Sequence, residues 1–112
     1  MLKPKDPREL VVALLKRSVC HVQVAAVLAD RYGIHSWGTN HIGFDGFGQH
    51  AEAECLRRAN RRRLGGSTLY VAATRRRNGK VVSSRPCELC RPILRKVGMV
   101  MWRDSDGVWK VL

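Results

Sequence analysis

The sequence is poor in long apolar runs and in cysteines, and one stretch is almost without acidic residues. No uninterrupted apolar run is longer than Val24–Ala29, whereas about 20 apolar residues are needed to span a bilayer. Charged residues such as Lys3, Asp6 and Arg8 interrupt the start of the chain, which therefore has no apolar region typical of a signal peptide. We expect a cytoplasmic protein that makes no contact with a membrane.

Four cysteines are too few for a disulfide-dense scaffold in a chain of 112 residues. A metal site, or free thiols in a reducing compartment, is the better interpretation. The length suits one domain with its own hydrophobic core, and an apolar content of 45% argues against disorder. We expect a single domain over residues 1–112, in which residues 1–6 form a flexible N-terminus.

The shortage of acidic residues is concentrated in the second half of the chain. Between Arg57 and Lys96 there are thirteen Lys and Arg residues and a single acid, Glu88, which accounts for the whole formal net charge of +12. A field of one sign attracts polyanions and releases counterions when they bind. We therefore expect contact with nucleic acid, and the alternative is a solvated surface that keeps the protein in solution. The candidate contacts are Arg57, Arg58, Arg61, Arg75, Arg76, Arg77 and Lys80.

The periodicity of apolar residues predicts helices alternating with strands. Helical spacing predicts three helices, over residues 7–17, 50–64 and 90–97. β-branched and apolar segments predict five strands, over residues 19–30, 34–39, 68–74, 99–103 and 108–112. Residues 40–49 are rich in glycine and are expected to form a shaped loop. This order predicts an α/β fold with one mixed sheet and helices on its faces.

Two short motifs stand 37 residues apart, His50-Ala51-Glu52 and Pro86-Cys87-Glu88-Leu89-Cys90, and each opens a predicted helix. A Cys-x-x-Cys at a helix start directs two sulfurs to one spot, where amide dipoles favour thiolates. With the imidazole of His50, Cys87 and Cys90 supply three ligands for Zn²⁺ and leave its fourth tetrahedral position open, as in a catalytic site. Glu52 can reach past the metal to a place where a proton shuttle is needed.

A His-x-Glu followed by a Pro-Cys-x-x-Cys is the motif of the zinc nucleobase deaminases. From about residue 10 to its end, the chain resembles the cytidine deaminase superfamily in both motif and element order. The resemblance implies a three-layer α/β/α fold with a five-stranded mixed sheet, Zn²⁺ as the cofactor and hydrolytic deamination at the ring C–N bond. The predicted C-terminal hairpin is similar to the subdivision that holds the free cytidine deaminases and several bacterial polynucleotide deaminases, which favours cytosine over adenine.

The same resemblance implies roles for individual residues. His50, Cys87 and Cys90 match the zinc ligands of the family. Glu52 matches its general acid/base, which takes a proton from the attacking water, gives one to the ring nitrogen and protonates the departing ammonia. The candidate substrate contacts are Asn40 for the sugar, the Ala51 backbone N–H for the pyrimidine carbonyl, Ser84, and Phe44 or Phe47 for stacking on the base.

Two departures from the family pattern bear on the fold and on the substrate. Pro92 removes an N–H early in the last helix, where most relatives have a helix former. The segment Arg75–Lys80 is longer and more basic than the short link of the free-nucleoside enzymes. We therefore expect the substrate to be cytosine in single-stranded DNA or RNA. Free cytidine, deoxycytidine or their monophosphates are the alternative, and a non-catalytic, zinc-stapled nucleic-acid-binding module is the second.

Several residues outside the motifs receive structural interpretations. Trp37 falls in a predicted strand and Cys55 lies on the apolar stripe of the helix that begins at His50, so we expect both in the core. Cys20 is interpreted in the same way. His41 follows Asn40 in the predicted substrate loop, where it is a further candidate for contact with a sugar or phosphate.

Overall fold

The computed structural model of the chain describes residues 6–42, 48–88 and 90–112. Its helices are α1 (Pro7–Leu14), α2 (Ala51–Arg58) and α3 (Arg91–Leu94), with the 3₁₀ turns η1 (Leu15–Arg17) and η2 (Arg61–Gly66). Its strands are β1 (Val22–Asp30), β2 (Gly33–Thr39), β3 (His41–Ile42), β4 (Gly48–Gln49), β5 (Thr68–Arg75), β6 (Val81–Val82), β7 (Met99–Arg103) and β8 (Trp109–Val111). None of the helices in the described residues is long and apolar enough to cross a membrane.

The N-terminal residues predicted to be flexible fall outside the described part of the chain, except for Asp6. The Asp6 carboxylate accepts the backbone N–H of Arg8 at 2.9 Å and so caps α1. Pro7 follows at the first helical position, where the missing N–H costs no hydrogen bond. Asp6 and Pro7 thus form a local signal for the start of α1.

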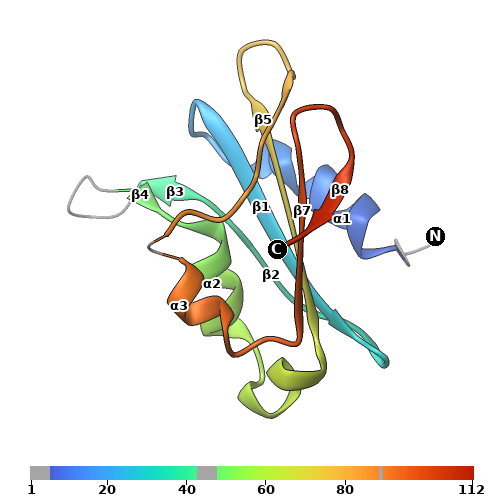
Figure 1. Cartoon of the computed structure of the whole chain (residues 1–112). Helices are drawn as coiled ribbons and strands as arrows, with labels where there is room; N and C mark the ends of the chain where they lie inside the picture. Colours follow the sequence, from blue (N-terminus) through green and yellow to red (C-terminus); the bar gives the residue numbers. More distant parts are fainter. Residues whose placement is uncertain (1–5, 43–47, 89) are drawn as a thin grey trace, which may run out of the picture.

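One six-stranded mixed sheet forms the centre of the molecule (Figure 1). Its main order is β2-β1-β5-β7-β8, in which β5 and β7 are parallel and the other neighbours are antiparallel. β6 pairs with the end of β5, so the sheet has one strand more than the five predicted. The extra strand arises because the tight turn at Asn78-Gly79, where Gly79 has a φ of +68°, returns the chain beside β5.

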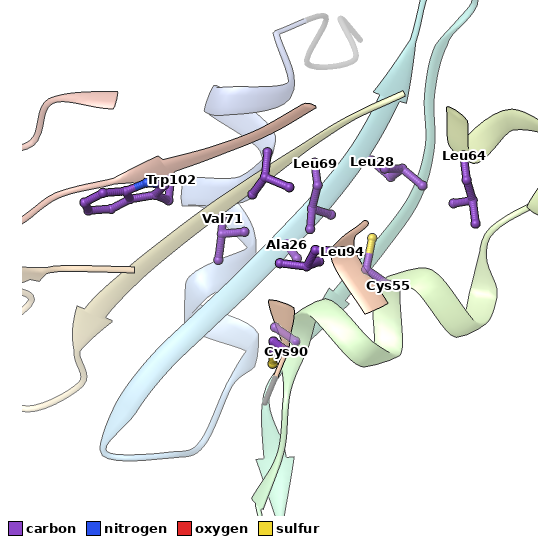
Figure 2. Close-up of a cluster of buried hydrophobic side chains, with 11 residues drawn as sticks. Ala26, Leu28, Cys55, Leu64, Leu69, Val71, Cys90, Leu94 and Trp102 are labelled. Carbon is purple, nitrogen blue, oxygen red and sulfur yellow. The ribbon is translucent and has the colours of Figure 1, made fainter. Parts of the chain in front are cut away.

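Helices cover both faces of the sheet, which confirms the predicted three-layer α/β/α fold (Figure 1). The larger core lies under α2, η2 and α3 and consists of Ala26, Leu28, Ala51, Cys55, Leu64, Leu69, Val71, Cys90, Leu94, Val100 and Trp102 (Figure 2). The smaller core lies under α1 and consists of Val11, Leu14, Leu15, Ala25, Val27 and Ala72. Successive residues of β1 and β5 alternate between the two cores because strand side chains point to opposite faces.

The long helix predicted after residue 50 is divided into α2 and η2. Asn60 separates them, because its side-chain oxygen accepts the N–H of Arg62 at 3.0 Å, and such local hydrogen bonds compete with a continuing helix. Arg63 of η2 then forms a bidentate ion pair with Asp30 at the end of β1, with both N–O distances 2.7 Å. This pairing lowers the pKa of Asp30 and fixes η2 to the sheet.

The last helix is shorter than predicted, since α3 contains only four residues. Pro92 lies within its first turn, where a helix needs no N–H from it, and it therefore does not disrupt the helix. Gly98 follows the turn after α3, as predicted. A Cβ at Gly98 would lie 2.6 Å from the carbonyl oxygen of Gly65, so only glycine allows the chain to pass η2 at this distance.

The prediction that Trp37 is a core residue is only partly right. Its ring packs against the smaller core but is half-buried, because β2 is an edge strand of the sheet. The guanidinium carbons of Arg17 and Arg58 lie 5.3 Å and 4.8 Å from the ring centroid, which are cation–π distances. Cys55 is fully buried as predicted, and burial raises its pKa to about 12.

Gly38 allows β2 to approach α2 closely. A Cβ at this position would lie 2.7 Å from both the carbonyl oxygen of Ala51 and the backbone nitrogen of Cys55. Gly38→Ala should therefore push α2 away from the sheet and lower the free energy of unfolding, measured in urea, by about 2–3 kcal/mol, as overpacked cores do. Gly66→Ala is the matched control, because no atom lies within 4 Å of its added Cβ. If Gly38→Ala and Gly66→Ala unfolded at the same urea concentration, the close packing of β2 against α2 would be contradicted.

Candidate active site

Three metal-ligating side chains meet beside the starts of α2 and α3. His50 precedes α2 in an extended conformation, and a bond of 3.0 Å from the Cys90 N–H to the Cys87 carbonyl closes a turn between the two cysteines. The Nδ1 atom of His50 lies 3.1 Å from the Sγ atom of Cys90 and 3.8 Å from that of Cys87. The two sulfurs are 3.6 Å apart. The structure thus brings together the three ligands that the sequence predicts.

The spacing of these donor atoms fits a zinc ion. Zn–S and Zn–N bonds are about 2.3 Å and about 2.0–2.1 Å long, so ligand atoms at two corners of a tetrahedron lie roughly 3.4–3.8 Å apart. The observed separations of 3.1, 3.6 and 3.8 Å are close to this range. Among the described residues the group has three members. A tetrahedral ion would therefore keep one position for water or substrate, as catalytic zinc does.

The electrostatics of the group also favour the binding of a cation. Cys90 is buried, and burial together with the nearby Glu52 carboxylate raises the pKa of its thiol. Thiolates are the form that binds metals, and a bound divalent cation reverses such shifts by stabilising the negative charge. Two thiols, an imidazole and a carboxylate at one place therefore form a site that becomes favourable when a divalent ion neutralises it.

Glu52 lies beside the ligands without belonging to their group. It occupies the first turn of α2, is only 5% exposed, and lines the cavity described next. Burial raises the pKa of its carboxyl, and the charge of His50 and a hydrogen bond with Cys90 oppose this effect. A buried carboxyl with a raised pKa is suited to taking up and releasing protons near neutral pH.

A cavity of about 250 Å³ opens in front of these groups. Its walls come from the segment before β1, from β1 itself, from Asn40 and the start of β3, from the start of α2, from β5, and from the segment between β6 and α3. The lining residues are Cys20, Val22, Val24, Asn40, His41, His50, Ala51, Glu52, Ala73, Ser83, Ser84, Arg85 and Cys87. The cavity joins predicted ligands, the predicted acid/base and three predicted substrate contacts in one place.

Two of the predicted substrate contacts, Asn40 and Ser84, also form hydrogen bonds within the protein. Asn40 accepts hydrogen bonds at Oδ1 from Ser18 and Val24 and donates through Nδ2 to the Val22 carbonyl, so one N–H of its amide is left for a ligand. The Ser84 hydroxyl accepts a hydrogen bond from the Arg103 N–H and donates one to the Val71 carbonyl at 2.7 Å. Ser84 therefore joins β5 to β7 as well as lining the cavity.

Ala51 is fully buried at the first position of α2 and is one of the residues that line the cavity. The predicted stacking residues Phe44 and Phe47 lie outside the described residues. Their segment joins β3 to β4, and these two strands pair through His41 with Gln49 and Ile42 with Gly48. β4 ends at Gln49, directly before the His50 ligand.

The predicted nucleic-acid contacts occupy separate places. Arg75, Arg76, Arg77 and Lys80 form the turn between β5 and β6, which we call the basic hairpin. Arg58 is engaged with Glu54 at 3.4 Å and with the Trp37 ring. Arg57 and Arg61 line a different depression, the α2–α3 groove, whose residues are Ala53, Leu56, Arg57, Arg61, Leu64, Gly65, Ile93 and Lys96. The groove and the cavity have no lining residue in common among those that the structure describes.

Sequence reasoning missed two parts of the cavity wall. Cys20 was expected in the core, but β1 begins only at Val22, and the half-buried Cys20 lies on the cavity side of the segment before it. Arg85 enters the sequence analysis only as one charge among many, although it lines the wall two residues before Cys87. Its guanidinium carbon lies 5.9 Å from the centroid of the Trp102 ring. The position of Arg85 directly before Pro86-Cys87 is a sequence signal that could have revealed it.

His41 also reaches this cavity, as its place after Asn40 led us to expect. Its Nδ1 atom lies 3.0 Å from a carboxylate oxygen of Glu54. Glu54 is therefore held between His41 and Arg58, and its side chain is only 10% exposed because it lies on the side of α2 that faces Gly38 of β2. The two glutamates of the His-Ala-Glu-Ala-Glu segment thus have different surroundings, since Glu52 faces the ligands and Glu54 contacts the half-exposed side chains of His41 and Arg58.

Comparison with known proteins agrees with the site. The sequence model of the cytidine and deoxycytidylate deaminase zinc-binding region matches residues 7–102, which include both motifs. Fold and site together define a zinc-dependent hydrolase of the nucleobase deaminase class. The chain belongs to the cytidine and deoxycytidylate deaminase family. It is a zinc deaminase for cytidine-type substrates.

Solved structures share the fold at low sequence identity. Cytidine deaminase from Burkholderia pseudomallei superposes with a TM-score of 0.71 at 18% identity, over 95% of this chain and 88% of that one. Cytidine deaminase from Mycobacterium leprae gives 0.59 at 21%, over 93% and 88%. The enzyme from Mycobacterium tuberculosis gives 0.56 at 20%, over 83% and 79%. No curated protein sequence matches the chain.

Proposed function

We propose that this deaminase converts cytosine to uracil within single-stranded DNA or RNA. The observation that carries the proposal is the attachment of the basic hairpin to the rim of the cavity. The Arg76 backbone N–H donates to the His21 carbonyl, and its guanidinium donates to the Val19 carbonyl, both at 2.9 Å. Cys20 and Val22 of the same segment line the cavity, and this attachment supports a path for a strand from the hairpin cations to the cavity.

A single strand suits this arrangement better than a free nucleoside does. Single-strand-binding surfaces combine cations that follow the backbone with an enclosed place for a base, and deaminases turn the target base into such a pocket. Arg85 in the wall provides a partner for a phosphate next to the target base. A lone cytidine monophosphate would satisfy Arg85 but would leave the four cations of the basic hairpin without a partner.

The proposed chemistry assigns the proton transfers to Glu52. Bound to His50, Cys87 and Cys90, Zn²⁺ would act as a Lewis acid that lowers the pKa of water. Water adds to the ring carbon that bears the amino group, and the Glu52 carboxylate takes its proton and passes it to the adjacent ring nitrogen. The C–N bond then breaks, Glu52 returns a second proton from the water to the leaving amino group, and uracil and ammonia are released.

Two groups of the wall would orient the base for this reaction. The backbone N–H of Ala51 donates to the pyrimidine carbonyl oxygen, and the free amide N–H of Asn40 donates to the sugar. Because both sit on elements fixed by the sheet, the base would be held in one orientation at low entropic cost. Its amino-bearing carbon would then face Glu52.

The test changes Arg75, Arg76 and Arg77 together to serine. The ratio of kcat/KM on a single-stranded oligonucleotide to that on free cytidine should fall, because fewer phosphates are neutralised. Each lost phosphate contact flattens the log–log salt dependence by about 0.7 on single strands, so the slope should fall by up to about 2. DNA and RNA oligonucleotides with one cytosine, followed by mass spectrometry of the product, give the rates.

A matched variant removes the same charge elsewhere. Arg8, Arg31 and Arg62 are exposed and line no part of the cavity, so changing them to serine should leave the salt slope closer to that of the wild type. The proposal would be wrong if wild-type protein had a higher kcat/KM on cytidine or its monophosphate than on oligonucleotides at matched ionic strength. That result would assign the enzyme to free substrates.

A further inference from the structure

The α2–α3 groove is a second concave surface, and the proposed function does not use it. Its lining residues come from α2, η2 and the segment of α3, and its volume of about 570 Å³ is more than twice the 250 Å³ of the cavity. Leu56, Leu64 and Ile93 form its apolar floor and belong to or pack against the larger core. The groove is thus a place where the outer side of the main core is incompletely covered.

Its rim is strongly cationic. Arg57, Arg61 and Lys96 are exposed and line it, each from a different segment of the chain. Among the described residues that line the groove, none is acidic, and none of the ion pairs found in the structure involves these three cations. An occupant must therefore bring both apolar groups for the floor and negative charges for the rim.

The chemistry of the floor distinguishes between polyanions. Proteins that bind single strands stack the bases on aromatic side chains, whereas the described lining of this groove is aliphatic and contains no aromatic ring. Leucine and isoleucine side chains on a floor between two helices are typical of grooves that receive the apolar face of an amphipathic helix. The rim cations then select an occupant with acidic residues beside that face.

A second copy of this chain does not meet these requirements. The chain has a formal net charge of +12, so two copies repel one another. None of its described helices combines an apolar stripe with acidic flanks. Helix α1 contains only one acidic residue, and α2 contributes Arg57 to the lining of the groove itself.

We propose that the α2–α3 groove binds an acidic amphipathic helix of a partner protein, with the aliphatic residues of that helix on Leu56 and Ile93 and its carboxylates on Arg57, Arg61 and Lys96. Because the groove shares no lining residue with the cavity, the partner would bind without entering the active site. The groove opens on the outer side of α2, the helix that begins with the His50 ligand. A bound helix would therefore stabilise the arrangement of elements that holds the metal site.

The experiment selects binders without assuming a sequence. A phage-displayed library of 16-residue helix-forming peptides is panned against the zinc-loaded protein. Enriched peptides should have leucine or isoleucine at spacings of three and four residues and Asp or Glu beside them. The best peptide is synthesised and titrated calorimetrically. Changing Arg57, Arg61 and Lys96 together to glutamate should weaken its binding by at least about tenfold, because three attractions become repulsions.

The matched control reverses three charges on the basic hairpin, Arg75, Arg76 and Arg77. It alters the net charge equally, so a peptide held only by long-range attraction would be weakened to the same degree by both variants, which would overturn the proposal. A milder variant, with glutamine at the three groove positions, should weaken binding by a smaller factor. Zinc content and thermal unfolding show that each variant is folded.

Three other results would also overturn the proposal. The first is that no enriched peptide depends on the groove residues. The second is that the groove variant weakens oligonucleotide binding more than the hairpin variant does, which would make the groove a nucleic-acid track. The third is that the wild-type protein sediments as an oligomer that the groove variant dissociates, which would make a second copy the occupant. None of these outcomes depends on which cytosine substrate the enzyme uses.

Discussion

Glu52→Gln should retain the zinc and the fold and lose at least about 10⁴-fold in kcat. A general acid/base typically contributes 10²–10⁴-fold, and Glu52 serves several successive proton transfers in the proposed chemistry. The amide has nearly the shape of the carboxyl group, so it can occupy the same buried position beside Cys90. Product formation on cytidine and on oligonucleotides measures the loss, and metal analysis shows that the ligand group is intact.

The matched control is Glu54→Gln on the same helix. Glu54 pairs with His41 and Arg58 and lies outside the ligand group. Its replacement should lower the rate by no more than about tenfold, in keeping with the loss of one ion pair worth about 1 kcal/mol. If Glu52→Gln deaminated at nearly the wild-type rate, the enzyme assignment of Glu52 would fail. The zinc-stapled binding module would then be the better interpretation of this chain.

Cys87→Ala should abolish activity, remove the zinc and lower the stability. Two ligands remain in this variant, which is too few for a tight tetrahedral site. A ligand present at about 1,000 times its Kd stabilises a fold by about 4 kcal/mol, and the zinc joins the start of α2 to the turn before α3. Metal analysis and urea denaturation of the purified protein should show the two losses together.

Cys20→Ala is the control for this prediction. Its thiol lines the same cavity but lies outside the ligand group, so the variant should keep about one zinc per chain and most of its stability. An active preparation of the wild-type protein that contains no zinc would contradict the metal assignment. His50→Ala should behave like Cys87→Ala, because the Nδ1 atom of His50 faces both sulfurs.

Local patterns were sufficient to predict much of the fold. Apolar periodicity and glycine positions indicated β1, β2, β5, β7, β8 and the helix starts to within a few residues, and β7 was predicted with its observed bounds. The two-residue strands β3, β4 and β6 were not predicted, since β3 and β4 lie within the predicted loop 40–49. The boundaries that failed depend on single side chains. Asn60 ends α2 through a hydrogen bond to the Arg62 N–H, and η2 is held by the ion pair between Arg63 and Asp30, a partner 33 residues away.

The metal ligands could be predicted because their chemistry is carried by residue type and spacing. A Cys-x-x-Cys turn and a His-x-Glu helix start direct their side chains locally, and few other arrangements use these residues together. The remaining cavity wall could not be predicted in this way. Cys20, Ala73 and Arg85 come from three segments that meet only when β1, β5 and the approach to α3 are packed side by side.

The sequence by itself thus determined the class of chemistry and the approximate order of the elements, since both depend on short-range patterns. Only the tertiary structure decided how the charge of +12 is distributed. It separates the basic hairpin, which is hydrogen-bonded to the segment before β1, from Arg57 and Arg61 on the α2–α3 groove. It also engages Arg63 and Arg58 in ion pairs. The reason is physical: the surroundings of a charge are set by side chains distant in sequence, and these surroundings determine which partner it can bind.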